Sequence, residues 1–258
     1  GTGLGKEMAT HFASLGADIA ICGRREDPLK ETANSLTDQF GINAYYETLD
    51  IRSPQDVEGF VENVFNIKPL TGLVNNAAGN FISPTHKLSS RGFDAISNIV
   101  MHGTFYVTHS VGQKWISQQL PGSILSILAT WIWTGSAYVV PSAMSKSAIH
   151  AMTMSLAVEW GPKNIRVNAI APGAFPTKGM TARLDPNGSM MSEGADVSKS
   201  IPMGRVGKME ELQNLASFLM SDGCDYLTGQ SIAIDGAQHL SGGGTFSSLA
   251  SVSDEDWD

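Results

Sequence analysis

The chain is poor in the features that mark several classes of protein. It contains two cysteines, Cys22 and Cys224, far apart in the sequence, which fits neither a disulfide framework nor a metal site and favours a reducing compartment. Basic residues number 17 against 25 acidic ones, and the net charge of −8 argues against nucleic acid or an anionic membrane as a main partner. No apolar run approaches the roughly 18 residues that span a bilayer. With 42% hydrophobic and 16% charged residues, we expect a globular protein with a sizeable core.

Helical and strand-like segments alternate along nearly the whole chain. We expect strands at residues 18–22, 43–49, 72–75, 123–128, 166–170 and 231–234, and helices at 6–15, 28–39, 54–66, 91–119, 142–160 and 210–220. Strands that alternate with long helices predict right-handed crossovers. The sequence therefore predicts a single α/β domain over residues 1–240, with a Rossmann-type doubly wound parallel sheet. Residues 241–258 are rich in Gly, Ser and acidic residues, and we expect a tail there.

The sequence opens directly on Gly1-Thr2-Gly3-Leu4-Gly5, with no strand before this turn. In a doubly wound sheet the strand before the Gly-rich turn is central, and strands on both sides pair with it. Without that strand two inner edges stay unpaired, so we expect that the sequence is incomplete at its start. We expect a cytoplasmic, bacterial protein, or one of the mitochondrial matrix if a transit peptide precedes Gly1.

The Gly-rich turn opens a helix, where free N–H groups and the positive helix end hold a pyrophosphate. The next predicted strand leads to Arg24 and Arg25, with no acidic residue for a ribose 2′-hydroxyl. Two guanidinium groups there suit the 2′-phosphate of NADP(H), although they could also be solvated loop arginines. We expect Asp50 and Ile51 beside the adenine, and the loop after residue 171 beside the nicotinamide amide. The predicted cofactor-binding residues are Gly1, Thr2, Gly3, Leu4, Gly5, Arg24, Arg25, Asp50, Ile51, Asn76, Ala77, Ala78, Gly79, Lys146, Pro172, Gly173, Ala174 and Phe175.

These motifs together resemble the short-chain dehydrogenase/reductase family along nearly the whole chain. The resemblance is carried by the Gly-rich turn, Asn75-Asn76-Ala77-Ala78-Gly79, Lys146, Arg166-Val167-Asn168 and Pro172-Gly173. Within that family, the chain resembles the 2,4-dienoyl-CoA reductase branch at Ala77-Ala78-Gly79-Asn80-Phe81-Ile82-Ser83-Pro84, Val139-Val140-Pro141-Ser142-Ala143, Thr177-Lys178-Gly179 and Arg183-Leu184-Asp185-Pro186. The resemblance implies NADPH as cofactor, a fatty acyl-CoA substrate and a homotetramer.

The segment that ends at Lys146 has the spacing of a Tyr-x-x-x-Lys catalytic motif on a helix. Ser142 occupies the position of the tyrosine. A tyrosine beside a lysine can lower its pKa towards neutrality, whereas a serine cannot do so unaided. The general family pattern of Asn, Ser, Tyr and Lys matches His102, Ala129, Ser142 and Lys146 here, so only the lysine is kept. This excludes the usual mechanism, in which tyrosine moves a proton to or from an alcohol oxygen.

Reduction of a dienoyl thioester makes different demands on a site. Hydride adds to the far end of the conjugated system, so donors must face the thioester oxygen, while the last proton can come from water. In the branch that the chain resembles, the donors are a Tyr fifteen residues before the Lys and an Asn on the long helix; here those places hold Trp131 and His102. Both side chains can donate an N–H. We expect Lys146, His102, Trp131 and Ser142 to be catalytic, although His102 could be bound to backbone and Trp131 could be a wall of the pocket.

A substrate lid is expected near residues 176–205. Its methionines, Met180, Met190, Met191 and Met203, offer adaptable apolar surface for an acyl chain, and Lys178 and Arg183 are possible contacts for CoA phosphates. Two other functions stay open. The protein could be a non-catalytic NADP-binding relative that works through assembly, or a carbonyl reductase of unknown substrate with Tyr138 or His102 as its acid.

Overall fold

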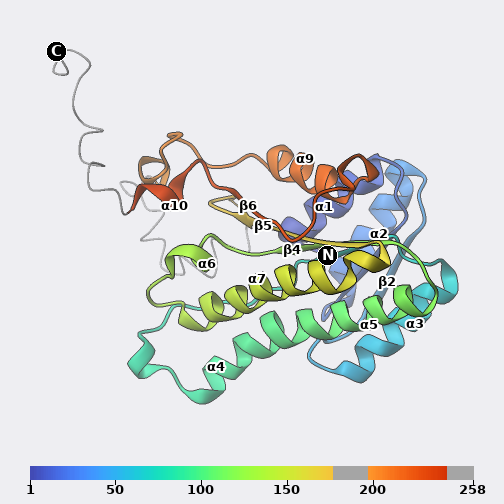
Figure 1. Cartoon of the computed structure of the whole chain (residues 1–258), viewed down its shortest axis with the longest axis horizontal. Helices are drawn as coiled ribbons and strands as arrows, with labels where there is room; N and C mark the ends of the chain where they lie inside the picture. Colours follow the sequence, from blue (N-terminus) through green and yellow to red (C-terminus); the bar gives the residue numbers. More distant parts are fainter. Residues whose placement is uncertain (177–196, 243–258) are drawn as a thin grey trace, which may run out of the picture.

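Parallel strands form the middle layer of the molecule, between two layers of helices (Figure 1). The structure is a computed structural model, and it describes residues 1–176 and 197–242. The strands are β1 (Ile19–Gly23), β2 (Ala44–Thr48), β3 (Gly72–Asn75), β4 (Gly122–Ile127), β5 (Ile165–Pro172) and β6 (Ser231–Ile234). All of the paired strands run parallel. The α/β class and the parallel arrangement predicted from the alternating pattern are confirmed.

Helices cover both faces of the strands (Figure 1). One layer consists of α1 (Gly3–Ser14), α2 (Glu26–Phe40) and α9 (Met209–Met220), and the other of α3 (Pro54–Ile67), α5 (Gly103–Ser117) and α7 (Val140–Trp160). Shorter helices that the sequence did not predict are α6 (Trp131–Thr134), α10 (Gln238–Ser241), η1 (Thr85–Lys87), η3 (Gly161–Lys163), η4 (Val197–Ser200) and η5 (Asp222–Cys224). Figure 1 shows α6 and α10 at the same end of the molecule, where the strands end.

The core under α3 and α5 shows why these segments are helical. Ser53 caps α3 by accepting a hydrogen bond from the Asp56 amide at 3.3 Å, and Pro54 suits the first turn because its missing N–H would have no partner there. Trp115 on α5 is fully buried in the same core, and its Nε1 donates to the Leu70 carbonyl at 2.6 Å. These contacts fix α3 and α5 against β3 and β4.

The strands divide into two sheets, β1–β2 and β3–β4–β5–β6, within the part of the chain that the structure describes. The edge of β1 that is not paired with β2, and the edge of β3 that is not paired with β4, have no partner strand among these residues. The expectation that two edges stay unpaired is therefore confirmed. The further expectation, a strand that precedes Gly1, stays a prediction.

The segment expected as one long helix at residues 91–119 is interrupted. α4 (Ser90–Ser97) passes into a π-helical turn, η2 (Asn98–His102), before α5 begins. A π turn holds one residue more than an α turn, so it rotates the following side chains relative to a regular helix, and such turns often occur at functional sites. The hydrophobic spacing at residues 93, 96 and 100 could not reveal this interruption, because it is equally compatible with an unbroken helix.

Two of the expected regions lie largely outside the described residues. They are the lid, including Met180, Met190, Met191, Lys178 and Arg183, and the tail after residue 242. Within residues 1–176 and 197–242, no helix is both long and apolar enough to cross a membrane.

Candidate active site

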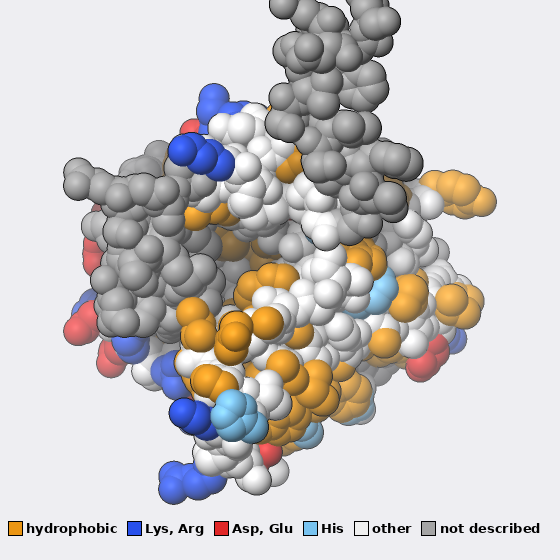
Figure 2. Space-filling model, turned by 90° about the vertical axis from the view of Figure 1, so that its left-hand side faces the viewer, with side chains coloured by type: hydrophobic (Ala, Val, Ile, Leu, Met, Phe, Trp, Pro, Cys, Tyr) orange, Lys and Arg blue, Asp and Glu red, His pale blue; other side chains and the backbone are white. Residues whose placement is uncertain are grey.

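A large cavity follows the carboxyl ends of the strands and continues between β1 and β3. Its volume is about 2620 Å³, well above the roughly 300–1,000 Å³ of an ordinary small-molecule site, because it includes the gap between the two sheets. Figure 2 faces the end of the molecule that carries α6 and α10, where hydrophobic side chains surround a hollow. Every residue expected to bind the cofactor lines the cavity, as do Trp131, Ser142 and Lys146.

The Gly-rich turn packs directly against the loop after β3. A Cβ on Gly5 would lie 2.6 Å from Asn76 Nδ2, so any larger residue here would displace the Asn76 amide. The N-terminus of α1 has no capping side chain and no acidic residue in its first turn, which leaves its N–H groups and its positive end available to an anion. Asn75 has a structural role, because its Nδ2 donates to Thr108 Oγ1 at 2.8 Å.

Arg24 and Arg25 are exposed at the rim of the cavity, just after β1. Neither arginine has an ion-pair partner among the described residues, so both guanidinium groups are available to an anionic ligand. Asp50 is engaged differently: Arg52 binds its carboxylate through Nε at 3.0 Å and Nη2 at 2.5 Å. This hydrogen bonding is the main reason why the pKa of Asp50 lies below its usual range.

The loop after β5 is held close to the end of β6. A Cβ on Gly173 would lie 2.6 Å from Asp235 Cβ, which explains why a glycine stands at this position. Phe175 is buried, and the Ala174 carbonyl accepts a hydrogen bond from the Gly207 amide at 3.0 Å. These contacts hold the loop beside the cavity, and its contact with the nicotinamide amide stays a prediction.

Lys146 is buried on α7, with 6% of its surface exposed. Its Nζ donates a hydrogen bond to the Ile127 carbonyl at the end of β4. Burial lowers the pKa of Lys146 to about 8, because the charged ammonium loses its hydration. The lysine thus lies at the cavity wall and changes its charge near pH 8.

Two hydroxyl groups lie in the same region without a partner. Ser142 and Thr130 both line the cavity with 4% and 9% of their surface exposed, and neither hydroxyl has a hydrogen-bond partner among the described residues. Neither oxygen is among the fully buried polar atoms that lack a partner, so both hydroxyls open to the cavity and are available to a ligand or to water. The sequence interpretation missed Thr130. The available signal was its place directly after Ala129, where the general family pattern has a serine.

Trp131 begins α6 and lines the cavity, and its indole N–H has no partner within the described part of the chain. Two other aromatic side chains near it are not part of the wall. Trp133 is 43% exposed and Tyr138 is 58% exposed, and neither lines the cavity. Tyr138 adopts a φ of 65°, and its carbonyl accepts a hydrogen bond from the Ser83 amide at 2.9 Å.

His102 is the one predicted catalytic residue that the structure keeps away from the cavity. It is exposed at the end of the π turn, whereas its neighbours Gly103 and Thr104 are buried and line the cavity. Its Nδ1 lies 3.5 Å from Tyr106 Oη, on the outside of the helix. The expectation treated residues 91–119 as a regular helix, and the π turn alters which side chains face inward. The geometry therefore does not support an inward-facing donor at this position.

A family model described as “Enoyl-(Acyl carrier protein) reductase” matches residues 1–239. The chain belongs to the short-chain dehydrogenase/reductase family. A Caenorhabditis elegans protein named “Probable 2,4-dienoyl-CoA reductase decr-1.2 [(3E)-enoyl-CoA-producing]” is 42% identical over 242 residues, covering 92% of this chain and 77% of that protein. A Bacillus subtilis (strain 168) protein named “Probable 2,4-dienoyl-CoA reductase [(2E)-enoyl-CoA-producing]” is 39% identical over 241 residues, 93% of each chain.

Solved structures agree with this assignment. A crystal structure of a short chain dehydrogenase from Bacillus anthracis has a TM-score of 0.82 and 38% identity, over 93% of both chains. A variant of the actinorhodin polyketide ketoreductase, solved with NADPH, has a TM-score of 0.85 and 25% identity, over 92% of this chain and 94% of that one. The protein is thus an oxidoreductase of the short-chain dehydrogenase/reductase family, and its resemblance to the 2,4-dienoyl-CoA reductases is confirmed.

Proposed function

We propose that the protein reduces a conjugated enoyl thioester of the 2,4-dienoyl-CoA type with NADPH. The observation that carries this proposal is the composition of the cavity wall around Lys146. The position of the family's tyrosine holds Ser142, and the cavity wall also includes Lys146, Trp131 and Thr130, whose side chains carry an ammonium, an indole N–H and a hydroxyl. Such groups stabilise a developing anion, but none of them is a proton-transfer group of the tyrosine type.

The residues that would hold a dinucleotide fit that group. The N-terminus of α1 is uncapped, Gly5 leaves room that a Cβ would fill, and Arg24 and Arg25 are free to meet a 2′-phosphate. When bound there, NADPH would supply the hydride. The NADPH in the polyketide ketoreductase structure supports a nicotinamide cofactor, and the two arginines support the choice of NADPH over NADH.

The chain's own residues would then act on the thioester. Lys146 would bind the nicotinamide ribose and contribute positive charge near the reacting oxygen, while Trp131 would donate its N–H to that oxygen. The hydroxyls of Ser142 and Thr130 would complete the hydrogen bonds of the substrate or the ribose, since each lacks a partner among the described residues. A water molecule would provide the final proton, because the Lys146 ammonium is engaged with the Ile127 carbonyl and no carboxylic acid, tyrosine or histidine among the described residues lines this part of the cavity.

A panel of substrates tests the proposal directly. NADPH oxidation is followed at its absorbance maximum with a 2,4-dienoyl-CoA, a 2-enoyl-CoA and simple ketones, and each assay is repeated with NADH. We expect turnover with the dienoyl-CoA and a preference for NADPH. Turnover of ketones in place of thioesters would overturn the proposal, and so would tight NADPH binding without turnover of any substrate.

The geometry disfavours the two other functions considered above. A carbonyl reductase needs an acid at the cavity, and both Tyr138 and His102 lie outside its wall. A purely structural nucleotide-binding protein does not require the Ser142 and Thr130 hydroxyls and the Lys146 ammonium to line one cavity. The substrate panel separates all three functions.

We also propose that the protein forms a homotetramer and works in the cytoplasm. Support for assembly comes from α7, where Met144, Met154 and Val158 expose 54%, 45% and 81% of their surfaces. Apolar side chains gathered on one helix face commonly mark a protein interface. Light scattering coupled to gel filtration checks the assembly, and a monomeric mass would contradict it.

A further inference from the structure

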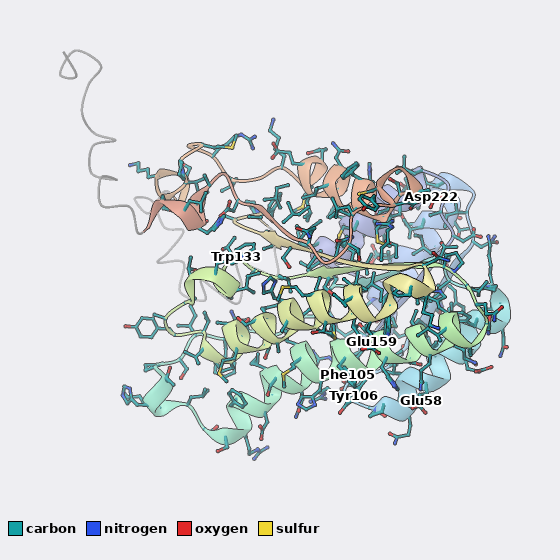
Figure 3. All side chains as sticks on the ribbon, viewed as in Figure 1. Glu58, Phe105, Tyr106, Trp133, Glu159 and Asp222 are labelled. Atoms are coloured by element: carbon teal, nitrogen blue, oxygen red, sulfur yellow. The ribbon has the colours of Figure 1, made fainter. Side chains whose placement is uncertain are left out.

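Trp133 lies between two histidines at the end of the molecule that carries α6 and α10. The centroid of its ring is 5.1 Å from that of His239, with the planes tilted by 30°, and 6.2 Å from that of His150, edge to face. Figure 3 labels Trp133 on α6, between the ribbons of α7 and α10. The three rings therefore join α6 to α10 and to α7.

Each histidine is held in place by an oxygen atom of the β6 region. Asp235 Oδ2 lies 2.7 Å from His239 Nδ1 and also accepts the backbone amide of His239 at 2.8 Å, while Asp235 Oδ1 accepts the Ala237 amide at 3.0 Å. His150 Nδ1 lies 2.8 Å from Ser231 Oγ. These bonds orient both rings independently of Trp133, so the indole packs on two side chains that other contacts already hold.

The helix that carries Trp133, α6, is too short to be stable without tertiary contacts. α6 has four residues, none of them buried, and Thr130 provides no side-chain cap. A helix of this length has no stability of its own in water. Apart from Trp133, its main apolar attachment is Ile132, which packs on the cluster that contains Ile96 and Val100.

Trp131 and Trp133 point to different sides of α6. Successive residues of an α-helix are rotated by about 100°, so residues two apart differ by about 200°. On one side of α6, Trp133 packs on the two histidine rings. On the opposite side, Trp131 lines the cavity. An anchor on the outer side therefore sets the direction of the indole N–H on the inner side.

We propose that His239, held by Asp235, positions Trp131 for the reduction by stacking on Trp133 and fixing α6. His239 is a positioning residue, since it does not line the cavity. The role in reduction rests on the proposed function, whereas the fixing of α6 does not. Two readouts are therefore needed, one of turnover and one of the local order of α6.

Steady-state turnover with a dienoyl-CoA gives the first readout, on the full chain and on His239→Ala, Trp133→Ala and the double variant. Each single change is expected to lower kcat about tenfold, because a loosened donor loses its alignment, with the KM for NADPH unchanged. The double variant is expected to lose no more than either single one, since both break the same contact. His239→Phe keeps a ring on Trp133 and is expected to restore most of kcat.

Hydrogen exchange gives the second readout, on the Gly135 amide, which bonds the Trp131 carbonyl at 2.9 Å. We expect exchange about tenfold faster in His239→Ala and Trp133→Ala, and near the wild-type rate in His239→Phe. His109→Ala is the matched control, because His109 stacks on Phe105 at 5.6 Å on α5, away from the cavity. This control should change neither kcat nor the exchange of α6.

The outcomes separate the two proposals. An active wild type with unchanged exchange in His239→Ala overturns the positioning role and leaves the proposed function standing. A wild type that reduces no thioester, with faster exchange in His239→Ala, overturns the proposed function and supports the contact that fixes α6. Additive losses in the double variant, or a His239→Phe variant as slow as His239→Ala, would overturn the stacking argument, because the histidine would then act through its nitrogen atoms.

Discussion

The two ends of the cavity differ in how they use their polar groups. At the Gly-rich turn the backbone itself forms the site, through the free N-terminus of α1 and the close approach of Gly5 to Asn76. At the reacting end side chains form it, and Ser142 and Thr130 are buried there with hydroxyls that no described residue pairs. The Gly-rich turn suits a dinucleotide, a ligand that a whole family can share. The side chains at the reacting end suit one particular type of reaction.

This difference explains how one fold can keep its cofactor and change its reaction. Backbone contacts survive most substitutions, because they depend on φ, ψ and the absence of a Cβ at a few positions. Proton transfer depends on single side chains with suitable pKa values. Loss of a tyrosine at Ser142 therefore alters the chemistry without disturbing the dinucleotide site. Substitutions that change cofactor binding without changing catalysis, or the reverse, test this separation between the two ends of the cavity.

Lys146 lies where the two ends meet, so its removal should have the largest effect. Lys146→Met keeps the volume and removes the charge, and we expect kcat to fall about a hundredfold to a thousandfold, the loss typical of a missing oxyanion donor. Steady-state kinetics with NADPH and a dienoyl-CoA measure this. Lys163→Met, an exposed change on η3, is the control. Less than a tenfold loss in Lys146→Met would remove the lysine from the mechanism.

The charge of Lys146 can also be removed by pH. Burial lowers its pKa from 10.5 to about 8, so the ammonium is present below about pH 8 and is lost above it. We expect kcat/KM, which reports the free protein, to fall about tenfold per pH unit above that value. Lys146→Arg, which stays charged, should show no such decline. A flat wild-type profile up to pH 10 would contradict the assignment.

The lowered pKa of Lys146 also makes the free energy of unfolding depend on pH, and the direction of the pKa shift sets the sign of this dependence. Below about pH 8 both the folded and the unfolded protein hold the proton, and the folded state bears the full cost of the buried charge. Between about 8 and 10.5 the unfolded lysine still binds a proton that the folded one has released. The contribution of Lys146 to the free energy of unfolding therefore rises across this window.

Arg24 and Arg25 test the cofactor end alone. Replacing both with Ala removes two charged donors from a 2′-phosphate, and we expect the preference for NADPH over NADH to fall about tenfold to a hundredfold. The kcat at saturating NADPH should stay near that of the wild type, because these residues follow β1 in one sheet, whereas Lys146 contacts the end of β4 in the other. The ratio of kcat/KM values for the two cofactors is the measurement. An unchanged ratio would mean that the arginines are solvated and bind no phosphate.

Thr130 tests the reacting end alone. Thr130→Val removes the hydroxyl and keeps the shape, so we expect kcat to fall about tenfold while the KM for NADPH holds. Thr130→Ser keeps the hydroxyl and should retain most of the activity. Thr134→Val is the matched control on α6, because the Thr134 hydroxyl bonds its neighbour's carbonyl, that of Gly135, at 2.8 Å. Equal activity in Thr130→Val and Thr130→Ser would show that the hydroxyl contributes nothing.

The sequence predicted the parts of this molecule that depend on local patterns. β3 and β6 have the expected bounds, and the Gly-rich turn, the Asn76 loop and Lys146 line one cavity, while their binding of a cofactor stays a prediction. The short α6 escaped prediction because side-chain packing on His150 and His239 stabilises it, and no local pattern encodes contacts with side chains that lie 17 and 106 positions away. The π turn escaped because the hydrophobic spacing of α4 and α5 does not register one additional residue.

His102 shows that a π turn can mislead a position-by-position match to the family's catalytic pattern. Its replacement is expected to have the smallest effect on kcat among these predictions. The family pattern places it where a donor would stand, but its ring is exposed and lies beside Tyr106. We therefore expect His102→Ala to change kcat by less than about twofold, within the usual range for a surface substitution. The same steady-state assay measures it, beside Thr130→Val. A tenfold loss of kcat in His102→Ala would mean that η2 turns this side chain inward when substrate binds, and the donor set would then include an imidazole.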